Sequence, residues 1–209
     1  MRRFKFVTHL IFIVFIICNV FNYNFAETEK WRLFKGNGFE LYLPQSWEGA
    51  CEEEFDLVIG FLKVIGQEAM ATQIKESPPS FFAYDSNFVM EEGSILTNII
   101  ISKETAYFLS LDKYMERASK AIEIYEEELS KSGISIDILE QKVVSLGKHP
   151  EVGRIIMKQT FLDLEMKQVQ YIIKSRINFW IVSITTGPRI FDNSLPTFDR
   201  IVERFTIKK

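Results

Sequence analysis

The chain has 209 residues, of which 47% are hydrophobic and 25% charged, and its formal net charge is −3 at pH 7. The hydrophobic fraction is typical of a packed globular protein, and no linker, Pro-rich tract or repeat divides residues 27–209. The acidic balance argues against nucleic acid or anionic lipid as the partner, because both carry negative charge.

The first 26 residues have the pattern of an export signal. Three of the first five residues are basic: Arg2, Arg3 and Lys5. An apolar run from Leu10 to Cys18 follows, and the first acidic residue is Glu27. The run has nine residues, whereas a membrane-spanning helix needs about 20. We therefore expect residues 1–26 to be a signal peptide and residues 27–209 to be an exported single domain. Retention of the first segment as a membrane anchor is the alternative.

The two cysteines limit the covalent chemistry. Cys18 ends the apolar run, but the large Ile17 before it disfavours lipidation, because the processing peptidase requires a small residue there. Removal of the signal leaves Cys51 alone, and one thiol cannot form an intramolecular disulfide. Removal also takes away three positive charges and no negative ones, so the formal charge moves from −3 to −6.

The first predicted elements form a β-hairpin and a helical insertion. Apolar residues alternate at 31–33 and 39–43 around Gly36-Asn37-Gly38, whose glycines can take positive φ, and Pro44 closes the hairpin. From residue 52 the apolar spacing becomes helical, with acidic residues at the N-terminus, where the helix dipole favours them. We expect helices at 52–65 and 67–76, ended by Ser77-Pro78-Pro79.

Two strands and the longest helix come next. Residues 81–84 and 94–101 have β character, and the second stretch is isoleucine-rich, so we expect both of its faces to be covered. The helix begins after Ser110, a favoured N-cap residue, and ends before Gly133, a favoured C′ residue. Acid-first i,i+4 pairs support it: Glu116 with Lys120, and Glu127 with Lys131.

The last third of the chain predicts an antiparallel meander and a closing helix. Four β-stretches occur, at 138–146, 152–162, 164–174 and 177–186. Their connections, beginning with Gly147-Lys148-His149-Pro150, are too short for parallel crossovers. The fourth stretch is apolar on both faces and should be central. A helix is expected after Asn193-Ser194, with Pro196 near its first position. Its buried stripe would be Leu195, Phe198, Ile201, Val202 and Phe205.

These elements predict an α+β fold: an antiparallel sheet of about six to seven strands with helices on both faces. The opening, Gly38-Phe39-Glu40-Leu41-Tyr42-Leu43-Pro44-Gln45-Ser46-Trp47, and the closing segment from Leu195 to Phe205 resemble the PsbP-like and DcrB-like exported domains. Thr185-Thr186 matches the Thr/Ser run of that family's last strand, while Glu203-Arg204 stands where the family often has Ser. The resemblance implies an α/β/α sandwich used by non-catalytic accessory, assembly or ligand-binding proteins, and it carries no active-site residues.

No sequence motif assigns a chemistry. The chain has no Gly-x-Gly-x-x-Gly, phosphate loop or Gly-x-Ser-x-Gly. A nucleophilic dyad would need Cys51 and His149, the only histidine after residue 26. We favour structural roles for both, because His149 precedes a proline in a turn and Cys51 lies at a helix entry. One thiol and one imidazole also lack the ligands of a zinc site.

Two groups of residues have compositions that also occur in binding sites. Acidic clusters at 52–56, 91–92 and 126–128 lack the alternating spacing of a calcium loop, so we interpret them as solvated surface. Three tryptophans could line a pocket for an apolar ligand, but core packing explains them: Trp31, Trp47 and Trp180. We therefore assign no catalytic, cofactor-binding or metal-binding residue and expect no cofactor.

The sequence favours a non-catalytic accessory or binding protein acting outside the cytoplasmic membrane, whether secreted, periplasmic or at the cell surface. Its partner would be a protein or an apolar small molecule, not nucleic acid, with membrane contact only through the first segment if that segment is retained. This interpretation predicts an exposed apolar patch or cleft near the insertion at 52–76. The alternatives are an unrecognised extracytoplasmic hydrolase and a membrane-tethered structural protein.

Overall fold

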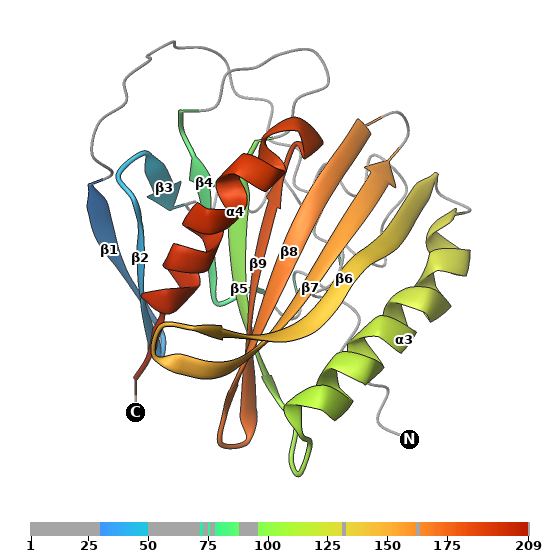
Figure 1. The fold of residues 1–209 in the computed structure, drawn as a ribbon, viewed down its shortest axis with the longest axis horizontal. Helices are drawn as coiled ribbons and strands as arrows, with labels where there is room; N and C mark the ends of the chain where they lie inside the picture. Colours follow the sequence, from blue (N-terminus) through green and yellow to red (C-terminus); the bar gives the residue numbers. More distant parts are fainter. Residues whose placement is uncertain are drawn as a thin grey trace.

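The computed structural model describes residues 30–49, 72, 75, 78–87, 96–130, 133–161 and 164–208. These residues form a seven-stranded antiparallel sheet with one helix on each face and a smaller three-stranded sheet at its side (Figure 1). The α+β prediction is confirmed. The predicted helices at 52–65 and 67–76 lie outside the described residues, apart from positions 72 and 75, which are helical.

The large sheet has the strand order β3-β4-β5-β9-β8-β7-β6. Its strands are β3 (Trp47–Gly49), β4 (Phe81–Asp85), β5 (Asn98–Thr105), β6 (Ile134–Leu146), β7 (His149–Phe161), β8 (Leu164–Ser175) and β9 (Asn178–Thr186). The meander from β6 to β9 is confirmed, and β9 lies between β5 and β8, buried along all but its first residue. The predicted strand at 94–101 is placed wrongly at its C-terminal end, because pairing with β9 continues to Thr105.

Strand β6 curves strongly across the large sheet (Figure 1). Its pairing with β7 shifts register between Ile138 and Glu140 and again between Val144 and Leu146. Each irregularity adds a residue to one strand, which bends it and increases its twist. The bend carries the turn at Gly147 to the end of the closing helix, where a Cβ on Gly147 would lie 3.1 Å from the side chain of Glu203.

Helix α3 (Leu111–Ser130) covers one face of β6, β7 and β8. The Ser110 hydroxyl accepts a hydrogen bond from the Lys113 N–H at 3.3 Å, which confirms Ser110 as the cap. Gly133 has a φ of 72°, as its predicted position after the helix requires. Gly153 on β7 lets the helix approach closely, since a Cβ there would meet the Met115 sulfur at 2.5 Å.

Helix α4 (Pro188–Glu203) covers the opposite face. The predicted start after Asn193-Ser194 is wrong, because Pro188 takes the first turn and Gly187 is the N-cap. Proline suits that position, where its fixed φ is already helical and its missing N–H has no partner to lose. Pro196 instead lies inside the helix. The buried side chains are Phe191, Phe198, Ile201 and Val202, and Phe205 is buried just beyond the helix.

The predicted N-terminal hairpin is confirmed but belongs to the smaller sheet. Strands β1 (Trp31–Gly36) and β2 (Phe39–Pro44) pair antiparallel, and β2 also pairs with β10 (Thr206–Ile207). One face of β2 is buried against the α4 side of the large sheet through Phe39, Leu41 and Leu43. The smaller sheet therefore extends the core on the α4 side.

Candidate functional site

The sequence-derived candidates lie in different settings. His149 begins β7, and its Nε2 is 2.8 Å from the carbonyl oxygen of Phe205, which ties the β6–β7 turn to the residue after α4. Cys51 and the acidic clusters at 52–56 and 91–92 lie outside the described residues. Within the described part of the chain, no group of three or more His, Cys, Asp or Glu side chains could hold a metal ion.

Two of the three tryptophans are buried in the core on the α4 side. The Trp180 ring lies 5.5 Å from that of Phe39 and 5.9 Å from that of Phe205, and the Lys103 ammonium lies 5.3 Å from its centroid. Trp47 is buried in the same cluster. Trp31 is half-buried, with the Arg204 guanidinium 4.2 Å from its ring centroid.

A charged network links α4 to the large sheet. Arg154 on β7 donates from Nε to Glu140 at 2.9 Å and from Nη1 to Asp199 of α4 at 3.3 Å. The Tyr171 hydroxyl donates to the same Asp199 carboxylate at 2.6 Å, and Lys142 pairs with Glu140 at 2.8 Å. The polar ends of these side chains have partners inside the network, so we assign it to holding α4 in place.

The network shifts the pKa values of its members. Burial raises the pKa of Tyr171 far above its usual value, and the Asp199 charge and hydrogen bond add to the rise. Burial also raises the pKa of Glu140, but the hydrogen bonds from Lys142 and Arg154 and their charges outweigh it, so the net pKa is lowered. Glu140 therefore stays ionised and Tyr171 stays protonated at neutral pH.

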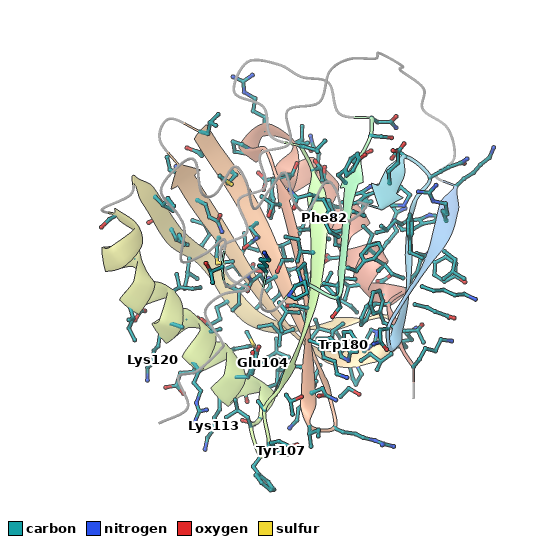
Figure 2. The ribbon with its side chains drawn as sticks, turned by 180° about the vertical axis from the view of Figure 1, so that it is seen from behind. Phe82, Glu104, Tyr107, Lys113, Lys120 and Trp180 are labelled. Atoms are coloured by element: carbon teal, nitrogen blue, oxygen red, sulfur yellow. The ribbon has the colours of Figure 1, made fainter. Side chains whose placement is uncertain are left out.

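A second partly buried acid lies on the α3 face. Tyr114 of α3 donates to Glu104 of β5 at 2.6 Å, and its ring stacks on Phe179 with centroids 4.0 Å apart. Burial raises the pKa of Glu104, and the Tyr114 hydrogen bond only partly opposes the rise. Figure 2 shows Glu104 beside the first turns of α3. This pair fixes the start of α3 against β5.

The α3 face also carries a row of buried polar side chains, which we call the amide band. Strand register places Gln168 of β8 opposite Thr185 of β9, and Thr185 opposite Asn98 of β5. In the neighbouring row, Gln170 lies opposite Ser183. Alternation along each strand points these side chains to the face that α3 covers in part. The amide band consists of Asn98, Gln159, Gln168, Gln170, Ser183 and Thr185, all buried.

Gln168 is the centre of the amide band. Its oxygen accepts hydrogen bonds from the Gln159 amide at 3.2 Å and the Gln170 amide at 3.3 Å. Its own amide donates to the Thr185 hydroxyl at 2.9 Å. The network thus crosses three neighbouring strands. Buried amides bonded to one another form a rigid polar surface, because each fixes the orientation of the next.

The two ends of the amide band have unpartnered acceptors. Among the residues that the structure describes, neither Asn98 Oδ1 nor Gln159 Oε1 has a hydrogen-bond partner, although each residue is only 1% exposed. A buried acceptor without a donor costs about 1–3 kcal/mol, so native structures leave few of them. Two such oxygens on one face of the sheet are the strongest local indication of a missing donor, and the amide band is the candidate binding site.

The sequence analysis missed the amide band. The only local sign is a polar residue at every second position in strands that are otherwise apolar, as in Gln168-Val169-Gln170. The same alternation is typical of a strand with one solvent-exposed face. Only the register of β5, β9 and β8 shows that the polar positions share one buried row.

The fold is similar to that of cyanobacterial PsbP (CyanoP) from Synechocystis sp. PCC 6803, with a TM-score of 0.57 and 11% sequence identity over 90% of this chain and 98% of that chain. This likeness confirms the PsbP-like fold. LpqN of Mycobacterium tuberculosis, described as involved in cell envelope biogenesis, has a TM-score of 0.48 at 12% identity, with 88% of this chain and 87% of that chain covered. The Ran-binding protein Mog1p of Saccharomyces cerevisiae has a TM-score of 0.46 at 10% identity, with coverages of 86% and 96%. We rest the fold assignment on the first of these.

No protein-family model and no curated protein sequence matches the chain. Among the residues that the structure describes, neither helix is both long and apolar enough to cross a bilayer.

Proposed function

We propose that the chain is an exported, non-catalytic accessory or binding protein that holds a ligand or partner group against its amide band. The observation that carries the proposal is the pair of unpartnered acceptors on Asn98 and Gln159. The amide band offers neutral amides and hydroxyls, which recognise a ligand by hydrogen bonding and do not transfer protons near neutral pH. Isoleucines beside it, Ile100 and Ile181, add apolar surface. This combination suits a largely apolar molecule with a few polar groups.

The likeness to CyanoP supports the proposal at the level of fold, because it places the chain on a PsbP-like scaffold. LpqN, whose fold is less similar, is described as acting in cell envelope biogenesis, which agrees with export. The export half rests on the basic residues and apolar run of 1–26. The domain organisation belongs to the same proposal: one domain over 27–209 with an insertion at 52–76.

Replacing the unpartnered amides tests the binding half. Asn98→Leu with Gln159→Met removes both acceptors and keeps the side-chain shapes similar, and it also removes the donors to Leu96 and Gln168. Native mass spectrometry of the protein isolated from its host should show a bound molecule on the wild type and none on the double variant. The matched control is Thr186→Val, which removes a buried hydroxyl on the opposite face, bonded to Thr97 at 2.6 Å. That variant should keep the ligand.

Stability separates binding from packing in this test. Without ligand, the double variant should unfold at a urea concentration close to that of the wild type. The removal of two unpartnered acceptors, each an uncompensated cost of about 1–3 kcal/mol, offsets the loss of the hydrogen bonds to Leu96 and Gln168. A wild type that carries nothing, together with a double variant that is markedly less stable, would reject the amide band as a binding site.

N-terminal sequencing of the exported product tests the proposal that the protein is exported with removal of its signal. A start near Glu27 supports signal removal, and an intact Met1 indicates a tether.

A further inference from the structure

The turn between β5 and α3 exposes two aromatic side chains. Tyr107 is 64% exposed and Phe108 is fully exposed, with their ring centroids 6.4 Å apart. The β8–β9 turn lies beside them and adds Ile177, which is also exposed. Figure 2 shows Tyr107 at the lower extremity of the molecule, beyond the body of the sheet. We call Tyr107, Phe108 and Ile177 the aromatic tip.

The two turns that carry the aromatic tip are bonded to each other and anchored to the core. The Ala106 N–H donates to the Ile177 carbonyl at 2.9 Å, which joins the two turns. Leu109 is buried in the core under α3, and Ser110 caps the helix. The residues before and after the aromatic pair are therefore fixed. The pair projects because the turn directs it outward.

The backbone of both turns is unfavourable for the residues they carry. Among the described residues, two non-glycine residues have positive φ: Phe108 at 61° and Arg176 at 55°. The left-handed region is a genuine outlier for a bulky side chain, and glycine would occupy it without strain. Residues held in this way concentrate at functional sites. The backbone of Phe108 is strained and its side chain is fully exposed, so packing does not explain why a phenylalanine stands at this position.

The charge around the aromatic tip is opposite to that of the whole chain. Residues 103–113 and 174–178 contain four basic side chains and two acidic ones, although the chain has a formal charge of −3. One of the acids, Glu104, already accepts the Tyr114 hydrogen bond. The basic side chains are Lys103, Lys113, Lys174 and Arg176. Among the described residues, no ion pair involves these four side chains.

The basic surface continues onto the neighbouring small sheet. The Lys103 ammonium lies over the Trp180 ring, and a Cβ on Gly38 would lie 3.5 Å from the same ring system. The Gly38 carbonyl accepts from the Lys208 N–H at 2.8 Å. Glu40 of β2 lies near three lysines, and its pKa is lowered chiefly by the hydrogen bond from Lys208. The lysines around Glu40 are Lys35, Lys148 and Lys208.

We propose that this end of the protein docks on an anionic bilayer, with Tyr107 and Phe108 inserted among the headgroups and the surrounding lysines and Arg176 against lipid phosphates. Aromatic side chains favour the membrane interface, and flanking basic side chains are attracted to anionic lipid. A protein partner fits less well, because protein interfaces are depleted of lysine. The docking is separate from the N-terminal segment and from the amide band, so it survives if either of those proposals fails.

The test places a reporter at the aromatic tip. Phe108→Trp is made in the protein as isolated from its host and mixed with vesicles of phosphatidylglycerol and phosphatidylcholine whose acyl chains are brominated. We expect fluorescence quenching beyond that of the wild type, and its loss in pure phosphatidylcholine or at high salt. The matched control is Leu139→Trp, because Leu139 is exposed on β6 at the edge of the sheet. That control should show no added quenching. A retained N-terminal anchor would not change this contrast.

Vesicle sedimentation of the processed protein gives the second readout. Phe108→Gly should weaken binding about tenfold or more, the loss expected for one inserted phenylalanine. It should leave the urea midpoint equal or higher, because glycine relieves the positive φ. Lys174→Gln should weaken binding about fivefold. Unquenched indole at position 108, with equal vesicle binding by Phe108→Gly and wild type, would overturn the proposal. So would concentration-dependent self-association that Phe108→Gly abolishes, since the tip would then bind a second copy.

Discussion

The two faces of the large sheet use the same strands for different purposes. On the α4 face, Val169 and Tyr171 of β8 join an apolar core, and Tyr171 is bonded to Asp199 of α4. On the α3 face, Gln168 and Gln170 of the same strand belong to the amide band. Side chains alternate between faces, so neighbouring residues of one strand meet different environments.

The faces differ in how their polar atoms are satisfied. The charged network on the α4 face is complete, because Arg154 bridges Glu140 and Asp199. The amide band on the α3 face ends in two acceptors without donors. A face whose polar groups are all paired offers a ligand no unsatisfied hydrogen-bonding atom. A ligand that supplies donors gains free energy by pairing with unpaired buried acceptors. We therefore regard the α4 face as scaffold and the amide band as the recognition surface.

The largest expected loss in the free energy of unfolding is for a core substitution on the α4 face. Phe198→Ala should lower the free energy of unfolding by about 3–5 kcal/mol, because it leaves a cavity between α4 and the sheet. Phe198 is buried and lies 6.2 Å from the Phe191 ring. Urea unfolding followed by circular dichroism measures the change. Leu139→Ala, at an exposed position on β6, is the control and should change stability little. Similar losses for both would contradict the description of this face as a packed scaffold.

A smaller loss is expected at the centre of the amide band. Gln168→Leu removes the acceptor for Gln159 and Gln170 and the donor to Thr185, and it should cost about 2–3 kcal/mol. Gln159→Met, at one end of the band, should cost less, since it removes one hydrogen bond, to Gln168, together with an acceptor that had no partner. Urea midpoints of the two single variants give the comparison. Equal changes would mean that the band is not organised around Gln168.

Strong local periodicity made most of the large sheet predictable. Strands β6 to β9 have alternating or continuous apolar patterns and short turns, and all four were predicted within a few residues of their bounds. The start of α4 could not be predicted, because Pro188 and Pro196 are both suitable for the first turn of a helix. The burial of Phe191 against the sheet extends the helix back to Pro188. Local sequence does not contain that contact.

The rest of the fold and the candidate site depend on contacts between distant residues. Strand β10 has two residues, and only its pairing with Glu40 and Phe39 makes it a strand. That pairing adds a third strand to the sheet that the N-terminal hairpin forms. The amide band likewise needs Asn98, Thr185 and Gln168 in one row across three strands. Each of these residues alone is an ordinary polar position, so the sequence predicts the strands but not the site that they form.

The smallest expected effects are pH-dependent and opposite in sign on the two faces. Glu140 on the α4 face has a lowered pKa, because the hydrogen bonds and charges of Lys142 and Arg154 outweigh the effect of burial. The unfolded chain therefore binds this proton first, and the stability that Glu140 contributes is present above the ordinary glutamate pKa of about 4.3 and is lost as the pH falls. Glu140→Gln should be less stable than the wild type at neutral pH, and the difference should shrink in acid.

Glu104 on the α3 face should behave in the reverse way. Burial raises its pKa, so the folded state holds the proton more tightly, and stability declines as the pH rises from the ordinary pKa towards the raised one. Glu104→Gln keeps an acceptor for the Tyr114 hydroxyl and removes the partly buried charge, so it should be more stable than the wild type at neutral pH and about equal in acid. Urea midpoints of both variants between about pH 3 and about pH 8 measure the contrast. If both variants shift in the same direction, the two carboxyls share one environment and the division between the faces does not extend to their charges.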